Sequence, residues 1–348
     1  MRLLPKIFSK GAFLLLILIS ITGTIRASVK YEIPDLSTLD RCLAAKGQTD
    51  AKYEQRIDRM KQQLQYTGNN HATRSKLLNE IMEAYLYYQF DSALVYVNKC
   101  YDDAEANHDT RAATSVLLYK ARLLSNGGFY NNAEDILKSI DFNKLPDNRL
   151  RYDYAITAYW TYVYWSAFTM DNTFSERIDS LRSHYLDIAI RYEKSDSPNW
   201  YYLMGERAYF VGEKPTKELE WYNKALKRCG TYGRLYSQTT FAIARAYRQM
   251  HNNKLYGQYL VKSAISDIQG SVKENAALQE LAMYIFDLDH DNATLAHSYL
   301  MAAMDDATFF NNKLRKLEIS NRLPSIAAAY QQQLQSQEKK IMLFIIAV

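Results

Sequence analysis

The stretch ARLLSNGGFYNNAEDIL, at residues 121–137, has the spacing of two helices joined by a tight turn. Ala121 and Ala133 lie twelve residues apart on either side of a glycine pair, and Tyr130 follows Gly128 by two positions. Small residues let two helices approach closely, and glycine tolerates the left-handed backbone of a tight turn. An aromatic ring can then fill the corner. The spacing therefore predicts a helical hairpin.

The same plan recurs along the chain about every forty residues. Positions equivalent to Ala121 fall at Ile81, Gly205, Ala244 and Ala282, so that successive anchors lie 40, 84, 39 and 38 residues apart. The interval of 84 holds two periods, and helical spacing at residues 152–170 and 174–192 supplies the missing hairpin. Six hairpins are therefore predicted between residues 72 and 310. The residues predicted to pack the repeats are Ile81, Ala93, Ala121, Gly128, Tyr130, Ala133, Gly205, Ala244 and Ala282.

The composition agrees with long helices and short connections. The 348 residues include only 12 Gly and 6 Pro, less than half the usual share of about 12%. A β-sandwich, a Rossmann sheet or a phosphate-binding loop needs more glycine than this. The hairpins resemble tetratricopeptide repeats (TPRs), although their period exceeds the usual length of about 34 residues. We therefore expect an all-α fold, an α-solenoid of about six TPR-like hairpins.

The first 27 residues have the pattern of an export signal. Basic residues from Arg2 to Lys10 precede the apolar stretch AFLLLILI at 12–19, and small residues follow near Ala27. The apolar run is shorter than the roughly 20 residues of a spanning helix, which favours a signal peptide over a retained anchor. We expect export to the periplasm. The rest of the chain is nearly neutral, with 39 basic and 38 acidic residues, so no nucleic acid partner is expected for this portion.

The chain ends in KKIMLFIIAV, in which residues 341–348 are all apolar. Eight helical residues reach only about 12 Å, far less than a bilayer core of about 30 Å. We interpret this stretch as the start of a transmembrane helix that tethers a single-pass protein to the inner membrane. The alternative is an apolar C-terminal tail that is prone to association. Pro324 is expected in the first turn of the last helix. The predicted segments are a signal peptide at 1–27, an N-terminal helical cap at 28–70, the TPR-like α-solenoid at 71–320, a juxtamembrane helix at 321–340 and the start of the transmembrane helix at 341–348.

Two stretches carry a family resemblance. Residues 263–340, which begin SAISDIQGSVKENAALQELAMYIFD, and the stretch FDSALVYVNKCYDDAE at 90–105 are similar to a bacterial TPR-like family of the Bacteroides type. Members of that family are exported and membrane-anchored, and they carry a domain of unknown function. The resemblance implies a periplasmic helical domain, one membrane helix, a coiled coil and a cytoplasmic tail, in proteins often described as transcriptional regulators. It supplies no active-site residues.

The first helices of stacked hairpins line the inner surface of such an array. Positions one and four residues after the anchors, with one residue three before Gly205, form a mixed aromatic and charged groove. The predicted groove residues are Tyr85, Arg122, Tyr202, Glu206, Tyr209, Arg245, Arg248 and Phe286. We expect a protein or peptide ligand, bound by a sensing or scaffolding module without catalysis. A glycan-binding protein is the alternative, and ordinary solvated helix faces are the simplest explanation.

No catalytic or cofactor motif accompanies the repeats. The sequence has no GxSxG, GxxxxGK[ST], GxGxxG or HExxH, and the acidic segment at 287–292 lacks the glycine and glutamate of a calcium loop. We therefore expect no catalytic residue, no cofactor and no metal site. An (α/α)-toroid glycan hydrolase is a less favoured alternative, because its carboxylates need long loops around a cleft. The oligomeric state, including a homodimer, is left open.

Overall fold

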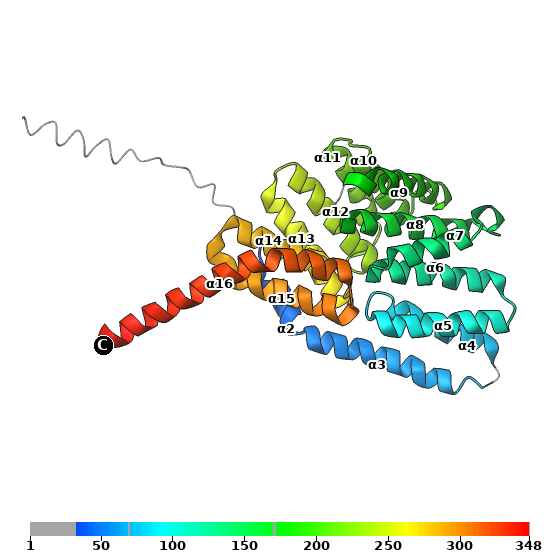
Figure 1. Cartoon of the computed structure of the whole chain (residues 1–348), viewed down its shortest axis with the longest axis horizontal. Coiled ribbons are helices and arrows are strands. Elements are labelled where there is room, and N and C mark those ends of the chain that lie inside the picture. Colours follow the sequence, from blue (N-terminus) through cyan, green and yellow to red (C-terminus); the bar gives the residue numbers. More distant parts are fainter. Residues whose placement is uncertain (1–32, 69, 170–171, 348) are drawn as a thin grey trace, which may run out of the picture. The chain divides into compact units, whose positions relative to one another are not determined.

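The computed structural model describes residues 33–68, 70–169 and 172–347. Within these ranges the chain forms fifteen α-helices, α2 to α16, and two short 3₁₀ helices, with no strand (Figure 1). The predicted all-α fold is therefore confirmed. The predicted signal peptide at 1–27 lies outside the described residues.

In the described part of the chain, twelve helices pair in order as six hairpins, as the forty-residue period predicts. Two helices precede the hairpins, one follows them, and the 3₁₀ helices lie in two of the connections. The hairpins are α4 (His71–Tyr85) with α5 (Phe90–Ala106), α6 (Thr110–Gly127) with α7 (Tyr130–Ser139), α8 (Asn148–Thr169) with α9 (Asn172–Tyr192), α10 (Pro198–Phe210) with α11 (Pro215–Leu226), α12 (Arg234–Gln249) with α13 (Asn253–Gln269), and α14 (Ala277–Leu288) with α15 (Ala293–Phe310). The remaining elements are α2 (Ser37–Ala44), α3 (Lys46–Gln65), η1 (Phe142–Lys144), η2 (His290–Asn292) and α16 (Lys313–Ala347).

Polar and proline residues start several of the helices, and a glycine supplies the turn in the second hairpin. Pro198 and Pro215 are the first residues of α10 and α11, where the missing N–H costs nothing. Gly128 follows α6 with a φ of 85°, the left-handed conformation that the turn at 121–137 requires. Six of the described helices are capped by a side chain that accepts the N–H three residues further on: Asn70, Asp109, Asp147, Ser197, Asn252 and Asn312.

The positions at which the hairpins approach most closely carry small residues. Ala121 of α6 and Ala133 of α7 are fully buried in one hydrophobic cluster. In the fourth hairpin, Gly205 of α10 faces the ring of Tyr222 of α11, and a Cβ atom at Gly205 would lie 2.3 Å from Tyr222 Cε1. The other residues assigned to repeat packing, Ile81, Ala93, Tyr130, Ala244 and Ala282, are also buried.

The last hairpin and the start of α16 contact hairpins that are far away in the sequence. Phe310, at the end of α15, packs with Phe90 in the core of the first hairpin, with 6.3 Å between ring centroids. Leu314 of α16 packs with Tyr130, the first residue of α7 in the second hairpin, and with Tyr164 of α8 in the third hairpin. Helices α2 and α3 contact α13. An array in which each repeat touches only its neighbours has no such contacts.

The last helix begins earlier than the sequence suggests. Helix α16 starts at Lys313, so Pro324 lies in its interior and not in its first turn. Asn311 ends α15 in the left-handed conformation, with a φ of 69°, and the side chain of Asn312 accepts the N–H of Arg315. The expectation for Pro324 was wrong because these two asparagines already supply the end of one helix and the start of the next.

The end of α16 presents apolar side chains to solvent. From Ile341 to Ile346 the side chains are 60% to 75% exposed. Within the described ranges, no helix combines the length and the apolar character needed to cross a membrane. The transmembrane start at 341–348 therefore stays a prediction.

Candidate ligand pocket

A cavity of about 220 Å³ lies between the first helices of the third, fourth and fifth hairpins. Helices α8, α10 and α12 supply most of its wall. Helix α13 and the connection between α13 and α14 close one side, and α16 contributes its first turn. The pocket thus brings together side chains that are far apart in the sequence, from Trp160 to Arg315.

Four-residue spacing turns the wall side chains toward the cavity. Trp160 and Tyr164 are one turn apart on α8. Tyr202, Glu206 and Phe210 follow the same spacing on α10. Residues i and i+4 lie on one face of a helix. Aromatic rings therefore alternate with a charged group along this wall.

Glu206 is the centre of a buried polar cluster. Its carboxylate, in a residue only 2% exposed, accepts the hydroxyls of Tyr159 (2.7 Å) and Tyr222 (2.8 Å) and the Nη2 of Arg245 (2.7 Å). The guanidinium of Arg245 also lies 3.6 Å from the centroid of the Tyr209 ring. Burial opposes the charge of Arg245, but the carboxylate of Glu206 more than offsets it and the pKa of Arg245 lies well above its usual value. The pair with Glu206 therefore keeps Arg245 charged despite its burial.

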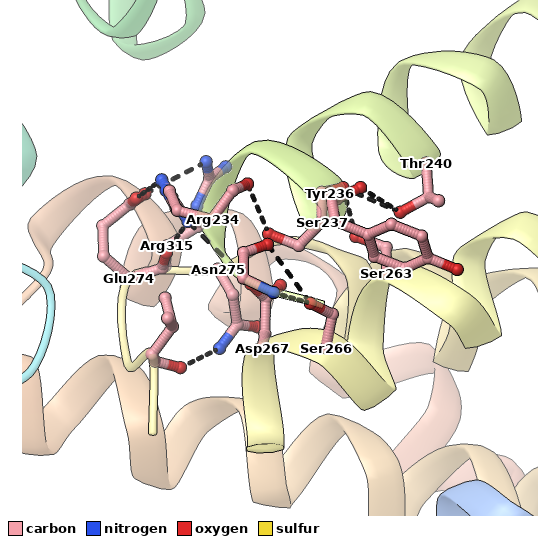
Figure 2. Close-up of polar contacts among 12 residues, drawn as sticks. Arg234, Tyr236, Ser237, Thr240, Ser263, Ser266, Asp267, Glu274, Asn275 and Arg315 are labelled. Carbon is pink, nitrogen blue, oxygen red and sulfur yellow. Dashed lines mark hydrogen bonds and ion pairs between the residues drawn. The ribbon is translucent and has the colours of Figure 1, made fainter. Parts of the chain in front are cut away.

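Glu274 forms a second cluster, in the connection between α13 and α14 (Figure 2). It is 1% exposed, and its carboxylate pairs with Nη2 of Arg234 from α12. Nη1 of Arg234 donates to the main-chain oxygen of Glu274 at 2.9 Å. Arg315 of α16 approaches Glu274 Oε1 at 3.5 Å and donates to Glu318 at 2.8 Å, and the Tyr164 hydroxyl donates to Glu274 at 3.3 Å. One carboxylate thus connects α8, α12 and α16.

Two further carboxyl groups, those of Asp267 and Glu218, have pKa values well above the usual range. Burial raises the pKa of Asp267, which lines the pocket, to about 7, although Arg234 opposes the shift from 4.0 Å away. That distance is too long for a hydrogen bond, and Oδ1 of Asp267 has no hydrogen-bond partner. Burial also raises the pKa of Glu218 on α11 to about 7, with Arg245 opposing the shift and Glu206 adding to it. Both groups are therefore partly protonated near neutral pH.

The family model of the SusR N-terminal TPR domain matches residues 43–321. The chain belongs to this family. The match runs from the end of α2, through all six hairpins, to the third turn of α16. It confirms the TPR-like nature that the forty-residue period and the family resemblance predict. No curated protein matches the chain.

Three of the eight residues predicted to form the groove line the pocket of this SusR-type TPR domain. They are Tyr202 and Glu206 on α10 and Arg245 on α12. Tyr209 lies beside them, because its ring stacks on Arg245. These four residues are brought together by the packing of α10 against α12.

The other four groove residues lie elsewhere in the SusR-type TPR domain. Tyr85 and Phe286 are buried in hydrophobic clusters, because their helix positions face neighbouring helices. Arg122 donates to Thr157 Oγ1 at 3.2 Å, between α6 and α8. Arg248 is on the exterior and pairs with Glu280. The eight residues do not form one continuous groove, and their role in binding stays a prediction.

Several pocket residues of the SusR-type TPR domain were not identified from the sequence. Trp160 and Tyr164 belong to an aromatic run at 152–165 whose rings occur on every side of the helix, so the run indicates no direction. Arg234 and Arg315 lie in the first turns of their helices, which the anchor spacing does not reach. The adjacent charged residues at 273–274, in a short connection between helices, are the sequence signal from which the cluster around Glu274 could have been predicted.

The chemistry of the site consists of aromatic rings and paired charges. In the ranges that the structure describes, no group of three or more His, Cys, Asp or Glu side chains could hold a metal ion. The cysteines Cys42, Cys100 and Cys229 are free. Three arginines of the wall, Arg234, Arg245 and Arg315, are each paired with a carboxylate of the same wall. The pocket can therefore offer rings and hydrogen-bonding groups without a large net charge.

Proposed function

We propose that this TPR domain is a non-catalytic sensing or scaffolding module that takes one uncharged side chain of a protein or peptide partner into its pocket. The observation that carries the proposal is the pocket, a small cavity in which aromatic rings lie beside paired arginines and carboxylates. Tyr, Trp and Arg are the residues that contribute most to binding at protein interfaces. TPR-type domains generally act as binding scaffolds, which supports the same function.

The dimensions and charge of the pocket support a limited, uncharged ligand group. About 220 Å³ is smaller than the usual ligand pocket of roughly 300 to 1,000 Å³, so an extended peptide does not fit. Three arginines and three carboxylates (Glu206, Asp267 and Glu274) line it, and their charges nearly cancel. A charged ligand group would add an uncompensated charge to these pairs, whereas a neutral polar or aromatic group would not.

A glycan ligand is the second candidate. The rings of Trp160 and Tyr164 offer flat apolar surfaces next to the carboxylates and guanidinium groups of the wall. A sugar ring has a complementary character, with an apolar face and a rim of hydroxyl groups. The size of the cavity then limits the bound part to about one sugar residue.

We propose binding without turnover. Asp267, with a pKa of about 7, has the protonation required of a general acid. Hydrolysis of a glycan also needs a second carboxylate that is free to act as base or nucleophile. Glu206 and Glu274 are each already engaged by arginine and tyrosine donors, so neither carboxylate is free for that role. Release of reducing sugar from an oligosaccharide panel by the purified chain would contradict this part of the proposal.

We further propose that the module lies in the periplasm and is tethered to the inner membrane through α16, as part of a regulatory protein. The pattern at 1–27 supports export, and the exposed apolar side chains at 341–346 support an anchor. The family description, an N-terminal domain, supports a longer protein with an output part. Fractionation of cells that produce the native protein tests the location, and recovery in the cytoplasm would contradict it.

Arg245 and Arg248 offer a matched pair of variants for the binding test. Both lie on α12, but Arg245 lines the pocket, whereas the side chain of Arg248 is 65% exposed. The purified chain is screened against peptide and oligosaccharide panels by calorimetry. For any ligand found, Arg245→Gln is expected to weaken binding about tenfold or more, since hydrogen bonds to charged groups contribute about 1.5 to 3 kcal/mol. Arg248→Gln should change the affinity for the same ligand less than twofold.

The two panels separate the candidate ligands. Binding of peptides alone supports the first candidate, and binding of oligosaccharides alone supports the second. Equal loss of affinity in both arginine variants would place the binding site outside the pocket. Absence of any ligand in either panel would count against a binding function for this cavity.

A further inference from the structure

Helix α16 forms part of the pocket wall with its first turn. Leu314 and Arg315 line the cavity, and the buried side chain of Leu314 packs with Tyr130 and Tyr164. Figure 1 shows α16 passing along α14 and α15, with its distal end extending away from the hairpins. A group that enters the pocket therefore touches the helix that leaves the repeat array.

The carboxylate of Glu274 is shared unequally between its two arginines (Figure 2). Arg234 holds Glu274 twice, through the carboxylate and through the main-chain oxygen at 2.9 Å. Arg315 reaches the carboxylate only at 3.5 Å, and it has a closer partner in Glu318 at 2.8 Å. A group that fills the pocket is therefore expected to displace Arg315 from Glu274 before it displaces Arg234, since Arg315 has the weaker contact and an alternative partner in Glu318.

The segment that carries Glu274 is fixed from its other side. Lys273, which is only 4% exposed, pairs with Asp50 of α3 at 2.5 Å and with Asp306 of α15 at 3.1 Å. Its main-chain N–H donates to the oxygen of Tyr87 at 2.8 Å. Breaking a buried pair of this kind is costly. The segment therefore stays in place when the pocket is filled, and the displacement falls on α16.

We propose that Glu274 couples the pocket to α16: a group that fills the pocket displaces Arg315 and loosens the first turns of that helix. The biological meaning of this coupling rests on the proposed binding function, to which it adds the direction of the response. Coupling between two sites is reciprocal, so a chain in which α16 is loosened binds pocket ligands more tightly. Docked α16 and a pocket ligand thus compete.

A tethered probe tests the coupling without a natural ligand. Ala167 of α8 lines the cavity and is exposed, so Ala167→Cys takes a methanethiosulfonate reagent. The background variant carries Cys42→Ser and Cys229→Ser. Cys100 stays unmodified, because it is buried and burial raises the pKa of its thiol to about 12. The matched control is Asn132→Cys, at an exposed position on α7 that does not line the pocket.

Hydrogen exchange measured by mass spectrometry reports the docking of α16. A benzyl adduct at position 167 is expected to speed exchange of the amides at 316–323 by at least about fivefold, the lower end of common coupling strengths. A methyl adduct at position 167 and a benzyl adduct at position 132 should change it less than twofold. Unchanged or slower exchange at 316–323, with labelling complete, would overturn the proposal.

Arg315→Met separates coupling through Glu274 from simple crowding. In this variant, hydrogen exchange of the amides at 316–323 should already be faster than in the native chain. The benzyl adduct should then speed that exchange by less than a further twofold. Arg177→Met removes an ion pair with Glu134, between α7 and α9, and should keep the full response. A full response in Arg315→Met would overturn the role of Glu274. If that variant does not fold, Arg315→Gln makes the same comparison. The adduct measurements need no natural ligand, so they test the coupling even when the peptide and oligosaccharide panels give no ligand. If no coupling is found, the proposed binding function is unaffected.

Discussion

At Gly205 the difference between a hydrogen atom and a methyl group determines whether α10 and α11 can pack. A Cβ atom there would lie 2.3 Å from the ring of Tyr222, whose hydroxyl is fixed by Glu206. Gly205→Ala is therefore expected to lower the free energy of unfolding by about 1 to 3 kcal/mol, measured by urea unfolding. Gly47→Ala is the control, because nothing lies within 4 Å of a Cβ atom at Gly47. Equal effects of the two substitutions would contradict the packing argument.

Asp267 connects stability to pH. Its pKa rises from 3.8 to about 7 in the folded chain because it is buried. Between these two values the folded chain binds a proton that the unfolded chain has released. The free energy of unfolding therefore falls as the pH rises from about 4 to 7, by up to about 1.4 kcal/mol per pH unit for one such group.

Asp267→Asn is expected to reduce that slope and to be more stable than the native chain at pH 8. The slope should not vanish, since Glu218 also has a pKa raised by burial to about 7 and acts with the same sign. Urea unfolding at several pH values between 5 and 8 measures both effects. Identical slopes in the variant and the native chain would show that Asp267 is not the group responsible.

Among the elements, α16 is unusual because it contains a proline in its interior. Pro324 cannot donate the N–H that would continue the helix ladder, and it is exposed, so its ring is not needed for packing. Pro324→Ala is expected to raise the free energy of unfolding by about 1 to 3 kcal/mol. Ser325→Ala, at the next exposed position, should change it by less than about 0.5 kcal/mol. Lower stability of Pro324→Ala would mean that the proline geometry helps α16 to pack.

The hairpins could be predicted from the sequence because their packing depends on local spacing. Ala121 and Ala133 are buried where their separation places them, and Gly128 adopts the expected left-handed turn. The start of α16 was missed because two asparagines define it, and such caps carry no periodic signal. The cluster around Glu274 was missed for another reason. Glu274 and Arg315 belong to separate elements, and only the folded chain brings them together.

At the scale of the whole molecule, Phe310 connects the last hairpin to the first. It is fully buried among side chains of α4 and α5, including Phe90. Phe310→Ala is expected to lower the free energy of unfolding by about 3 to 5 kcal/mol and to speed hydrogen exchange in α4 and α5. The neighbouring Phe309 is 41% exposed, so Phe309→Ala should cost less than about 1.5 kcal/mol. Exchange that rises only in α14 and α15 would contradict a connection between the two hairpins.

The contacts of Phe310 and Leu314 also restrict how this domain can change in evolution. Repeat proteins commonly gain or lose length by duplication or deletion of one unit, because each unit meets only its neighbours. Here an added or deleted hairpin would separate Phe310 from Phe90 and Leu314 from Tyr130 and Tyr164. Duplication of a single unit would therefore uncover two apolar surfaces at once. We expect homologues that keep these contacts to keep six hairpins, so that variation in length is confined to the connections and to the distal part of α16.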